Sequence, residues 1–340
     1  MHRCARRAGT GALAVVCALA LAPAAHAATA PAQVFAPNPV ADLGIETLTD
    51  QKDADYFSAD PRLRAAYHRV TLTDLTTPGT LSGAYAAVRS ETGAAAVNTG
   101  AGFIYTRDQD QFEQVMAYYW ITQAQRYIQS LGFGSTLPAV NRRPVPVRIN
   151  QFGGDNSFFR DTKTDITLGK GGVDDAEDAE VILHEYGHSV QDAQVAGFGT
   201  SADAGAIGEG FGDYLAVTVS AAVAPTPDPA CVADWDSTSY TTEVPHCLRR
   251  VDGAKHYPED LESPREVHAD GEIWSRALWD IRQALGARLA DTIIIRAQFG
   301  LAADTTMPAA AKQTIATAAL YGRAAQKAVT AAFAARGLVA

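Results

Sequence analysis

Apolar residues recur every three or four positions in four stretches of the chain, and this spacing predicts amphipathic helices. The clearest stretch is 266–286, because its apolar residues form one stripe and Gly286 supplies a stop signal. The other three lie within 110–134, around the run HEYGH at 184–188, and within 205–219. After Gly286 the chain is rich in alanine, and we expect further helices in 291–301 and 310–338.

The N-terminal part carries a different pattern. Short runs rich in β-branched and aromatic residues, bounded by turn signals, predict strands at 69–75, 101–106 and 145–150. The proline-rich segment 30–40 predicts an extended arm along the surface. Together these patterns predict an α+β fold, with a mixed N-terminal lobe at 28–173 and a mainly helical C-terminal lobe at 174–340.

The run HEYGH places two histidines four residues apart on one predicted helix. At about 100° per residue, His184 and His188 lie on the same face and can bind one metal ion together. Glu185 lies beside them, where its carboxylate can accept a proton from water activated by the metal. A solvent-exposed helix with no metal, preceded by the acidic run 174–180, is the alternative for this motif taken alone.

A catalytic zinc site needs a third protein ligand, and Glu209 is the candidate. We expect it near the start of the helix in 205–219, connected to the HEYGH helix by a short reversal. Asp213 lies one turn further on the same face and is expected to bind a ligand imidazole from behind. The flanking glycines predict close packing around the metal, although an ordinary charged face is also compatible with both carboxylates.

His268 precedes the apolar stripe of the helix at 266–286. At a helix N-terminus above a cleft, its imidazole can donate a hydrogen bond to the oxyanion of a tetrahedral intermediate. A plain helix-terminal or buried histidine is the alternative.

These segments resemble the glutamate-ligated zinc metallopeptidases, and the fungalysin-like pattern is nearer than the thermolysin-like one. That family joins HEYGH to a GEGWSD-type segment and to a VHAxGExW-type helix, and this chain reads HEYGH, GEGFGD and VHADGEIW. The resemblance implies a two-lobed zincin with the active site between the lobes. The run from Asp155 to Phe159 is similar to the family's edge strand, which implies that Asn156 and Ser157 bind the substrate backbone; a turn before a strand is the alternative.

Carried over residue by residue, the resemblance implies His184, His188 and Glu209 as zinc ligands, Glu185 as the base, Asp213 behind a ligand, and His268 as the transition-state donor. The chain departs from the family at several points. Phe and Gly at 211–212 replace the usual Trp and Ser, and the assisting tyrosine has no clear counterpart. The carboxylate that orients the donor histidine is not assigned among Asp260, Glu262 and Glu266, and the chain has little room for the family's large pro-region.

The first 27 residues have the features of a secretory signal peptide: a basic start, a short apolar stretch and small residues at 25–27. We therefore expect a secreted protein without stable membrane association, and we expect it to be a monomer. Removing the peptide leaves two cysteines, Cys231 and Cys247, which predict a disulfide in an oxidising compartment; two separate thiols are the alternative. The loop 225–264 that contains them is expected at the rim of the cleft, where Arg249, Arg250 and His256 can meet substrate.

Charge and composition narrow the partners. Lys and Arg number 28 against 38 Asp and Glu, a formal net charge of −10, which disfavours nucleic-acid binding. The carboxylates in 174–180 most simply complement the dipole of the HEYGH helix, and a calcium site there is a second possibility. The main hypothesis is a secreted zinc endopeptidase acting on polypeptides. A zinc aminopeptidase and a non-catalytic exported zinc-binding protein are the alternatives, and substrate preference does not follow from the sequence.

Overall fold

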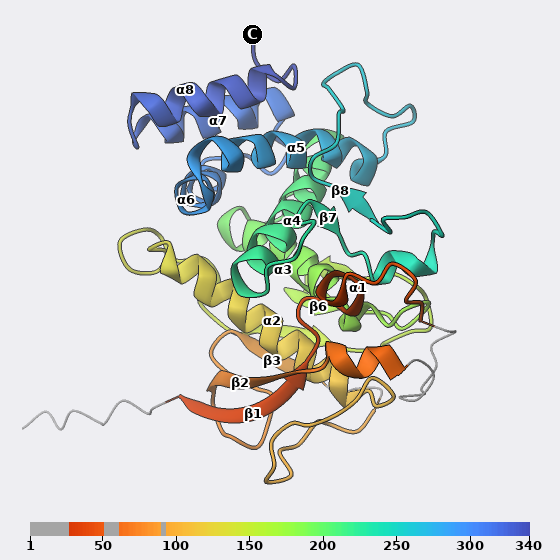
Figure 1. Cartoon of the computed structure of the whole chain (residues 1–340). Coiled ribbons are helices and arrows are strands. Elements are labelled where there is room, and N and C mark those ends of the chain that lie inside the picture. The colour runs from red at the N-terminus through yellow and green to blue at the C-terminus, as the bar shows by residue number, and fades with distance from the viewer. Residues whose placement is uncertain (1–26, 51–60, 90–92) are drawn as a thin grey trace, which may run out of the picture.

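A computed structural model describes residues 27–50, 61–89 and 93–340. The predicted signal peptide lies outside these residues, except for Ala27. No helix within the described ranges is long and apolar enough to span a membrane. The strands and helices run from one end of the molecule, formed by β1 and β2, to the other, formed by α7 and α8 (Figure 1).

The N-terminal part is built on two sheets. Strands β1 (Ala28–Val34) and β2 (His68–Leu75) form an antiparallel pair, and α1 (Pro39–Leu43) and the 3-10 helix η1 (Pro61–Ala66) flank them. The second sheet has the order β3-β4-β6-β5, in which β5 is the edge strand and is antiparallel to β6, whereas β3, β4 and β6 are parallel. Its strands are β3 (Ala86–Arg89), β4 (Val145–Arg148), β5 (Phe158–Arg160) and β6 (Asp165–Thr167).

Two expectations for this part are wrong. The segment 30–40 does not run along the surface, because its first half is strand β1, and Ala30, Ala32 and Val34 are at most 2% exposed. The segment 101–106 is not a strand, and only Phe103 forms a bridge, to Ala32. Gly102 has a φ of +110°, which interrupts an extended backbone. The next residue, Phe103, donates its N–H to the carbonyl of Pro31.

Helix α2 (Gln111–Ser130) lies between the strands and the C-terminal helices, and it is buried along most of its length. This burial explains its many apolar and aromatic residues, which cover more than one face. The backbone after it turns through Gly132, at a φ of +107°, as the sequence predicted.

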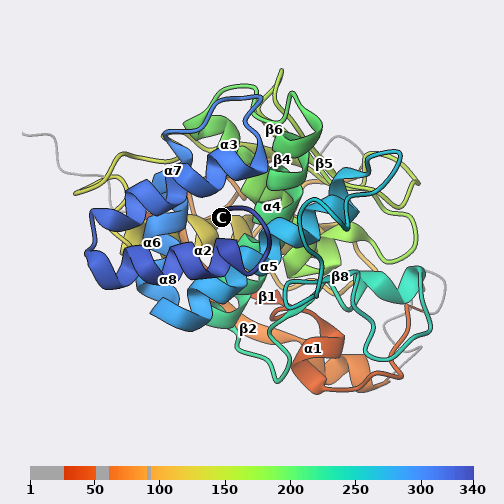
Figure 2. The ribbon, with the colours of Figure 1, turned by 90° about the horizontal axis from the view of Figure 1, so that it is seen from above.

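The centre of the molecule is formed by α3 (Ala179–Gln194), α4 (Ala202–Val223) and α5 (Val267–Leu285), which pack against one another. The short 3-10 helix η2 (Asp175–Glu177) leads into α3. Helices α6 (Ala287–Gln298), α7 (Met307–Ala319) and α8 (Arg323–Ala334) group together away from α1 and β8 (Figure 2). The predicted helix at 310–338 is therefore two helices, which Gly322 separates at a φ of +107°. One apolar core includes residues from both the strands and these helices, so the molecule has the predicted α+β fold.

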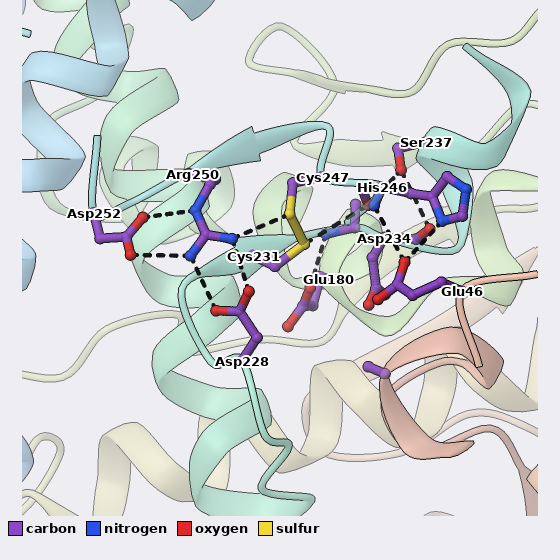
Figure 3. Close-up of a disulfide and its surroundings, with 12 residues drawn as sticks. Glu46, Glu180, Asp228, Cys231, Asp234, Ser237, His246, Cys247, Arg250 and Asp252 are labelled. Carbon is purple, nitrogen blue, oxygen red and sulfur yellow. Dashed lines mark hydrogen bonds and ion pairs between the residues drawn. A yellow bond between two sulfur atoms is a disulfide. The ribbon is translucent and has the colours of Figure 1, made fainter. Parts of the chain in front are cut away.

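The segment between α4 and α5 is held by a disulfide. Strands β7 (Cys231–Val232) and β8 (Arg249–Arg250) pair here, and the 3-10 helix η3 (Asp236–Ser239) lies between them. Cys231 and Cys247 are bonded, as the sequence predicted, with their Cα atoms 5.2 Å apart (Figure 3). The bond closes the loop that borders the site described next.

Candidate active site

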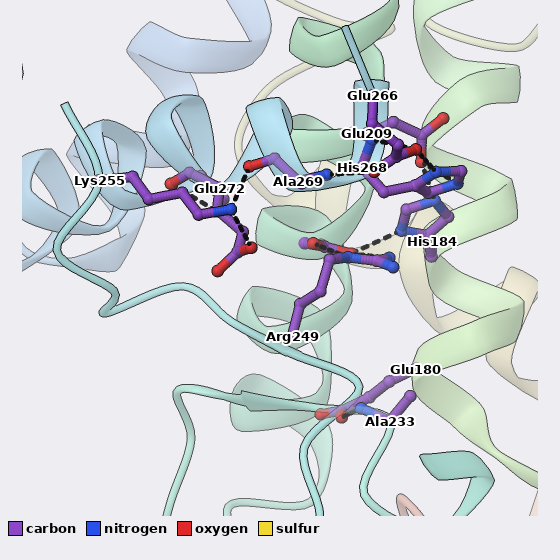
Figure 4. A network of polar contacts seen from close by, with 12 residues as sticks. Glu180, His184, Glu209, Ala233, Arg249, Lys255, Glu266, His268, Ala269 and Glu272 are labelled. Atoms are coloured by element: carbon purple, nitrogen blue, oxygen red, sulfur yellow. Dashed lines mark hydrogen bonds and ion pairs between the residues drawn. The ribbon is translucent and has the colours of Figure 1, made fainter. Parts of the chain in front are cut away.

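Two adjacent helices bring the three predicted ligands together. Nε2 of His184 lies 3.1 Å from Glu209 Oε2, and Nε2 of His188 lies 3.6 Å from Glu209 Oε1. One ligand atom from each of the three side chains lies within 4.8 Å of the others. Figure 4 shows Glu209 of α4 facing His184 of α3. The reversal at 195–201 sets this approach, as the sequence predicted.

Glu209 is not near the start of its helix, contrary to the expectation. Helix α4 begins earlier, at Ala202, where the Ser201 side chain accepts a hydrogen bond from Ala204 N. Glu209 is thus two turns inside α4. Several nearby glycines leave no room for a side chain, and at Gly212 a Cβ would lie 2.8 Å from the His184 ring. The glycine that replaces the family's usual serine thus lets the two helices approach at the ligand.

Asp213 and Arg249 support His184 from the side away from Glu209. Asp213 Oδ1 lies 2.8 Å from His184 Nδ1, and Arg249 donates to both carboxylate oxygens of Asp213 at 2.7 and 2.8 Å. Only 1% of the Asp213 side chain is exposed. Burial alone would raise the pKa of Asp213, but the charge and hydrogen bonds of Arg249 and the bond to His184 hold it well below its usual range. Asp213 is therefore an anion, and its hydrogen bond to Nδ1 fixes the orientation of the His184 ring.

The charges around the ligands are strongly coupled. Burial lowers the pKa of His188 to about 4, so this imidazole is neutral and free to bind a metal at neutral pH. Burial opposes ionisation of Glu209, but in the acidic range where Glu209 titrates His188 is protonated, and its charge and the hydrogen bond from His184 lower the pKa of Glu209 to about 2. Glu209 is therefore ionised, the form in which a carboxylate binds zinc.

Glu185 lies next to the ligands and is 6% exposed. Its Oε2 atom has no hydrogen-bond partner among the described residues. Burial raises the pKa of Glu185 to about 7, while the charge of His184 lowers it and that of Glu209 raises it. An unpaired carboxylate in this position is suited to exchange a proton with a molecule in the cleft.

His268 lies at the N-terminus of α5, above Glu209. Its Nε2 is 3.3 Å from Glu209 Oε2, and its Nδ1 is 2.7 Å from Glu266 Oε1. Glu266 is also the N-cap of α5, because its carboxylate accepts hydrogen bonds from the backbone N–H groups of residues 268 and 269. The structure thus identifies Glu266 as the carboxylate that orients His268, which the sequence left open among three candidates.

Two hollows meet at these residues. The first, about 500 Å³, extends toward the turn between α3 and α4, and the second, about 270 Å³, extends toward the disulfide-closed loop. The residues that line both hollows are Asn156, Ser157, His184, Glu185 and His268. Asn156 and Ser157 directly precede the edge strand β5, so the structure places both predicted substrate-binding residues in the wall of the cleft.

Sequence reasoning missed the principal role of Arg249. It placed this residue at the rim, among charges that meet substrate or solvent, whereas the structure buries its guanidinium against Asp213. Arg250 and His256 do remain at the surface. The signal was weak because nothing near Arg249 in the sequence indicates a partner 36 residues away.

Comparison with known proteins agrees with this geometry. Residues 167–290 match the model of the fungalysin metallopeptidase family. The predicted fungalysin-like and thermolysin-like relationship is confirmed. A curated relative, extracellular metalloproteinase 2 of Arthroderma otae, is 27% identical over 112 residues. That match covers 31% of this chain, which spans only 18% of the length of the relative.

A solved structure shows the same fold. The precursor of protealysin, a metalloproteinase from Serratia proteamaculans, superimposes with a TM-score of 0.52 at 16% sequence identity. The match covers 66% of this chain and 78% of that chain. The fungalysin-like segment contains both histidines of HEYGH, Glu209 and His268.

The donor set fits zinc. Two imidazole nitrogens and one carboxylate oxygen, a carboxylate behind one imidazole, and a hollow on the open side form the pattern of a catalytic zinc site. Softer metals prefer thiolates, and the two cysteines of the described residues are joined to each other. Residues His184, His188 and Glu209 would therefore hold one zinc ion and leave one position open.

Proposed function

We propose that the protein is a zinc-dependent endopeptidase, exported from the cell, in which Glu185 is the general base. The main support is one observation: an unpaired buried carboxylate lies beside a three-donor metal set at the junction of two hollows. The export proposal rests on the signal-like N-terminus and on the extracellular relative.

The two hollows favour an endopeptidase. Apart from the five shared residues and other parts of α3, they are lined by different elements, so the cleft continues on both sides of Glu185. A polypeptide can therefore extend in both directions from the bond that is cleaved. Asn156 and Ser157, next to the edge strand, are placed to bind its backbone by main-chain hydrogen bonds, as in strand addition.

Each protein group has a definite task in hydrolysis. Zinc held by His184, His188 and Glu209 would polarise the peptide carbonyl and increase the acidity of water. Glu185 accepts the proton of the attacking water and then delivers it to the nitrogen of the leaving amine, so the carboxylate is regenerated. Asp213 and Arg249 keep His184 in one orientation throughout.

His268 stabilises the charge that develops on the carbonyl oxygen. Glu266 lies 2.7 Å from Nδ1 and orients the ring, so that His268 lines the cleft and its Nε2 can serve as the hydrogen-bond donor. This donor is worth a few kcal/mol of transition-state stabilisation in comparable sites, roughly a factor of 100 or more in rate.

The test uses the Glu185→Gln variant, because glutamine keeps the size of the side chain and removes the base. We expect the purified variant to bind zinc as the wild type does and to lose activity on internally quenched peptides by a factor of about 100 to 10,000. His256→Gln, at an exposed histidine outside the lining of both hollows, is the matched control and should keep full activity. Full activity in Glu185→Gln would exclude the mechanism.

Peptides blocked at both ends distinguish the proposed endopeptidase from an aminopeptidase. An endopeptidase cleaves them internally, whereas an enzyme that anchors a free amine does not. Stoichiometric zinc without cleavage of any peptide in a broad library would instead support a non-catalytic protein.

A further inference from the structure

A second group of carboxylates lies outside the proposed zinc-ligand set, along the second hollow. Asp155 precedes the edge strand β5, Asp175 belongs to η2, and Asp236 belongs to η3 in the disulfide-closed loop. One carboxylate oxygen from each lies within 4.8 Å of the others. Asp175 and Asp236 line the second hollow, so the group borders the cleft.

Burial makes this group unusual. Asp175 is 3% exposed and Asp236 is 4% exposed, and Oδ1 of each has no hydrogen-bond partner among the described residues. A buried carboxylate oxygen without a partner costs free energy, so two of them facing one another indicate that something compensates the charge. No Lys or Arg of the described residues forms an ion pair with any of the three.

Protein donors compensate only part of this charge. Ser157 donates to Asp175 and Tyr240 donates to Asp155, so each of these carboxylates has one hydroxyl partner. Asp236 comes to the group from η3, and no side chain of the described residues donates a hydrogen bond to it. Burial raises the pKa of Asp175 to about 7, so without a cation this carboxylate ionises less readily than usual.

We propose that Asp155, Asp175 and Asp236 form a binding site for a hard divalent cation, calcium in class, separate from the zinc site. Calcium takes six to eight oxygen ligands at roughly 2.3–2.6 Å, so carboxylate oxygens on opposite sides of the ion are separated by up to about 5 Å. The observed spacing meets this condition. The neighbouring hydroxyl groups and water supply the remaining oxygen ligands.

The position of the site gives it a structural consequence. Its three ligands come from segments far apart in the chain: the approach to the edge strand, the entry to the HEYGH helix and the rim loop. A bound cation therefore connects both walls of the second hollow to the start of α3. Of the three residues, only Asp175 lies in the acidic run 174–180, where the sequence indicated a possible calcium site.

The test measures cation binding directly, so it does not depend on the proposed peptidase activity. Tyr240 donates to Asp155, which places a phenol at the site, and terbium bound there is sensitised by tyrosine excitation. With zinc-loaded full-length protein freed of other metals, we expect saturable terbium emission that calcium displaces. We also expect calcium at about 5 mM to raise the Tm, because this concentration exceeds the Kd of typical extracellular calcium sites.

Two variants and one matched control decide the outcome. Asp236→Asn should weaken terbium and calcium binding by at least about tenfold, because it removes one of three charged ligands. Asp234→Asn changes a buried aspartate of the same loop that is outside the group, and should bind both ions as the wild type does. Zinc content should be the same in all three proteins.

Asp155→Asn keeps the test decisive if Asp236→Asn does not fold, because Asp155 is only partly buried. Wild-type affinity in either folded variant would overturn the proposal. The absence of calcium-displaceable emission in the wild-type protein would overturn it as well.

Discussion

Replacing Arg249 by methionine tests whether the charge behind the zinc-ligand histidine is required. Methionine keeps most of the apolar stem and removes the guanidinium. In the wild type, this guanidinium donates two hydrogen bonds to Asp213, whose side chain is 1% exposed. The variant therefore leaves a buried carboxylate with His184 as its remaining side-chain partner.

The neighbouring residue is a matched control. Arg250 also forms paired hydrogen bonds with carboxylates, but Asp228 and Asp252 are 47% and 38% exposed at their side chains. Breaking a buried ion pair by removing one partner costs about 3–5 kcal/mol, whereas an exposed pair contributes about 1 kcal/mol or less. The two adjacent arginines should therefore differ by at least about 2 kcal/mol in the free energy of unfolding.

Zinc binding gives an independent measurement. Removing the outer partner of a metal ligand typically reduces metal affinity by about 10- to 100-fold. We expect this loss in Arg249→Met and none in Arg250→Met, measured by competition with a chromophoric chelator, and urea unfolding supplies the stabilities. Equal losses of stability in the two variants, with unchanged zinc affinity in Arg249→Met, would refute the reasoning.

Three further predictions use other parts of the structure. Burial raises the pKa of Glu180 to about 8, so the folded state retains a proton that the unfolded chain loses above its ordinary pKa. The stability that this group contributes is therefore present at low pH and lost as the pH rises toward 8. In Glu180→Gln, urea unfolding should show a smaller decrease of the free energy of unfolding over this pH range. Replacing Cys231 and Cys247 by serine opens a loop with a sequence separation of 16, and should lower the free energy of unfolding by about 3 kcal/mol. Gly212→Ala places a Cβ 2.8 Å from a ligand imidazole and should weaken zinc binding, whereas in Gly208→Ala the nearest atom is 3.5 Å away and zinc binding should be unchanged.

Each of these three predictions has a result that would contradict it. An unchanged pH dependence of stability in the Glu180 variant would mean that other groups cause it. A double serine variant as stable as the wild type would mean that the disulfide does not contribute to stability. Equal zinc affinity in the two alanine variants would show that α3 and α4 separate without cost.

The grouping of the three proposed zinc ligands could be predicted, because helical geometry fixes much of it. The spacing of His184 and His188 on a helix places both on one face, and the segment around Glu209 has its own helical pattern. The start of α4 was predicted too late, because residues 202–206 are alanine, aspartate and glycine and show no apolar periodicity. A serine N-cap at Ser201 was the signal that marks the true beginning.

Strand β1 could not be identified for a similar reason. Its inward positions Ala30 and Ala32 are small, and Pro31 between them favours an extended arm on the surface. The strand is stabilised by its register against β2 and by the carbonyl of Pro31, which accepts a hydrogen bond from Phe103. Those contacts join residues about 40 to 70 apart, and no local pattern encodes them.

The acidic run before the HEYGH helix shows the same limit. From the sequence, these carboxylates are expected to face solvent and to complement the dipole of the HEYGH helix. Asp178 is indeed the N-cap of α3. Yet Asp175, Glu177 and Glu180 are each at most 5% exposed. They are buried because the disulfide-closed loop between α4 and α5 folds over them. The Ala233 N–H donates to Glu180, and the Trp235 indole donates to Glu177.

The charges of the proposed zinc site link metal binding at the three ligands to the ionisation of Glu185, the proposed base. Without a metal, the pKa of Glu185 is raised to about 7, chiefly by burial and in smaller part by the negative Glu209. A bound dication reverses this balance, because with neutral imidazoles its two charges, added to that of Arg249, offset Glu185, Glu209 and Asp213. The ionised base is then part of a site with no net charge, and its burial becomes inexpensive. Arg249 is required for this balance, so its removal should disturb the proton affinity of Glu185 as well as the position of His184.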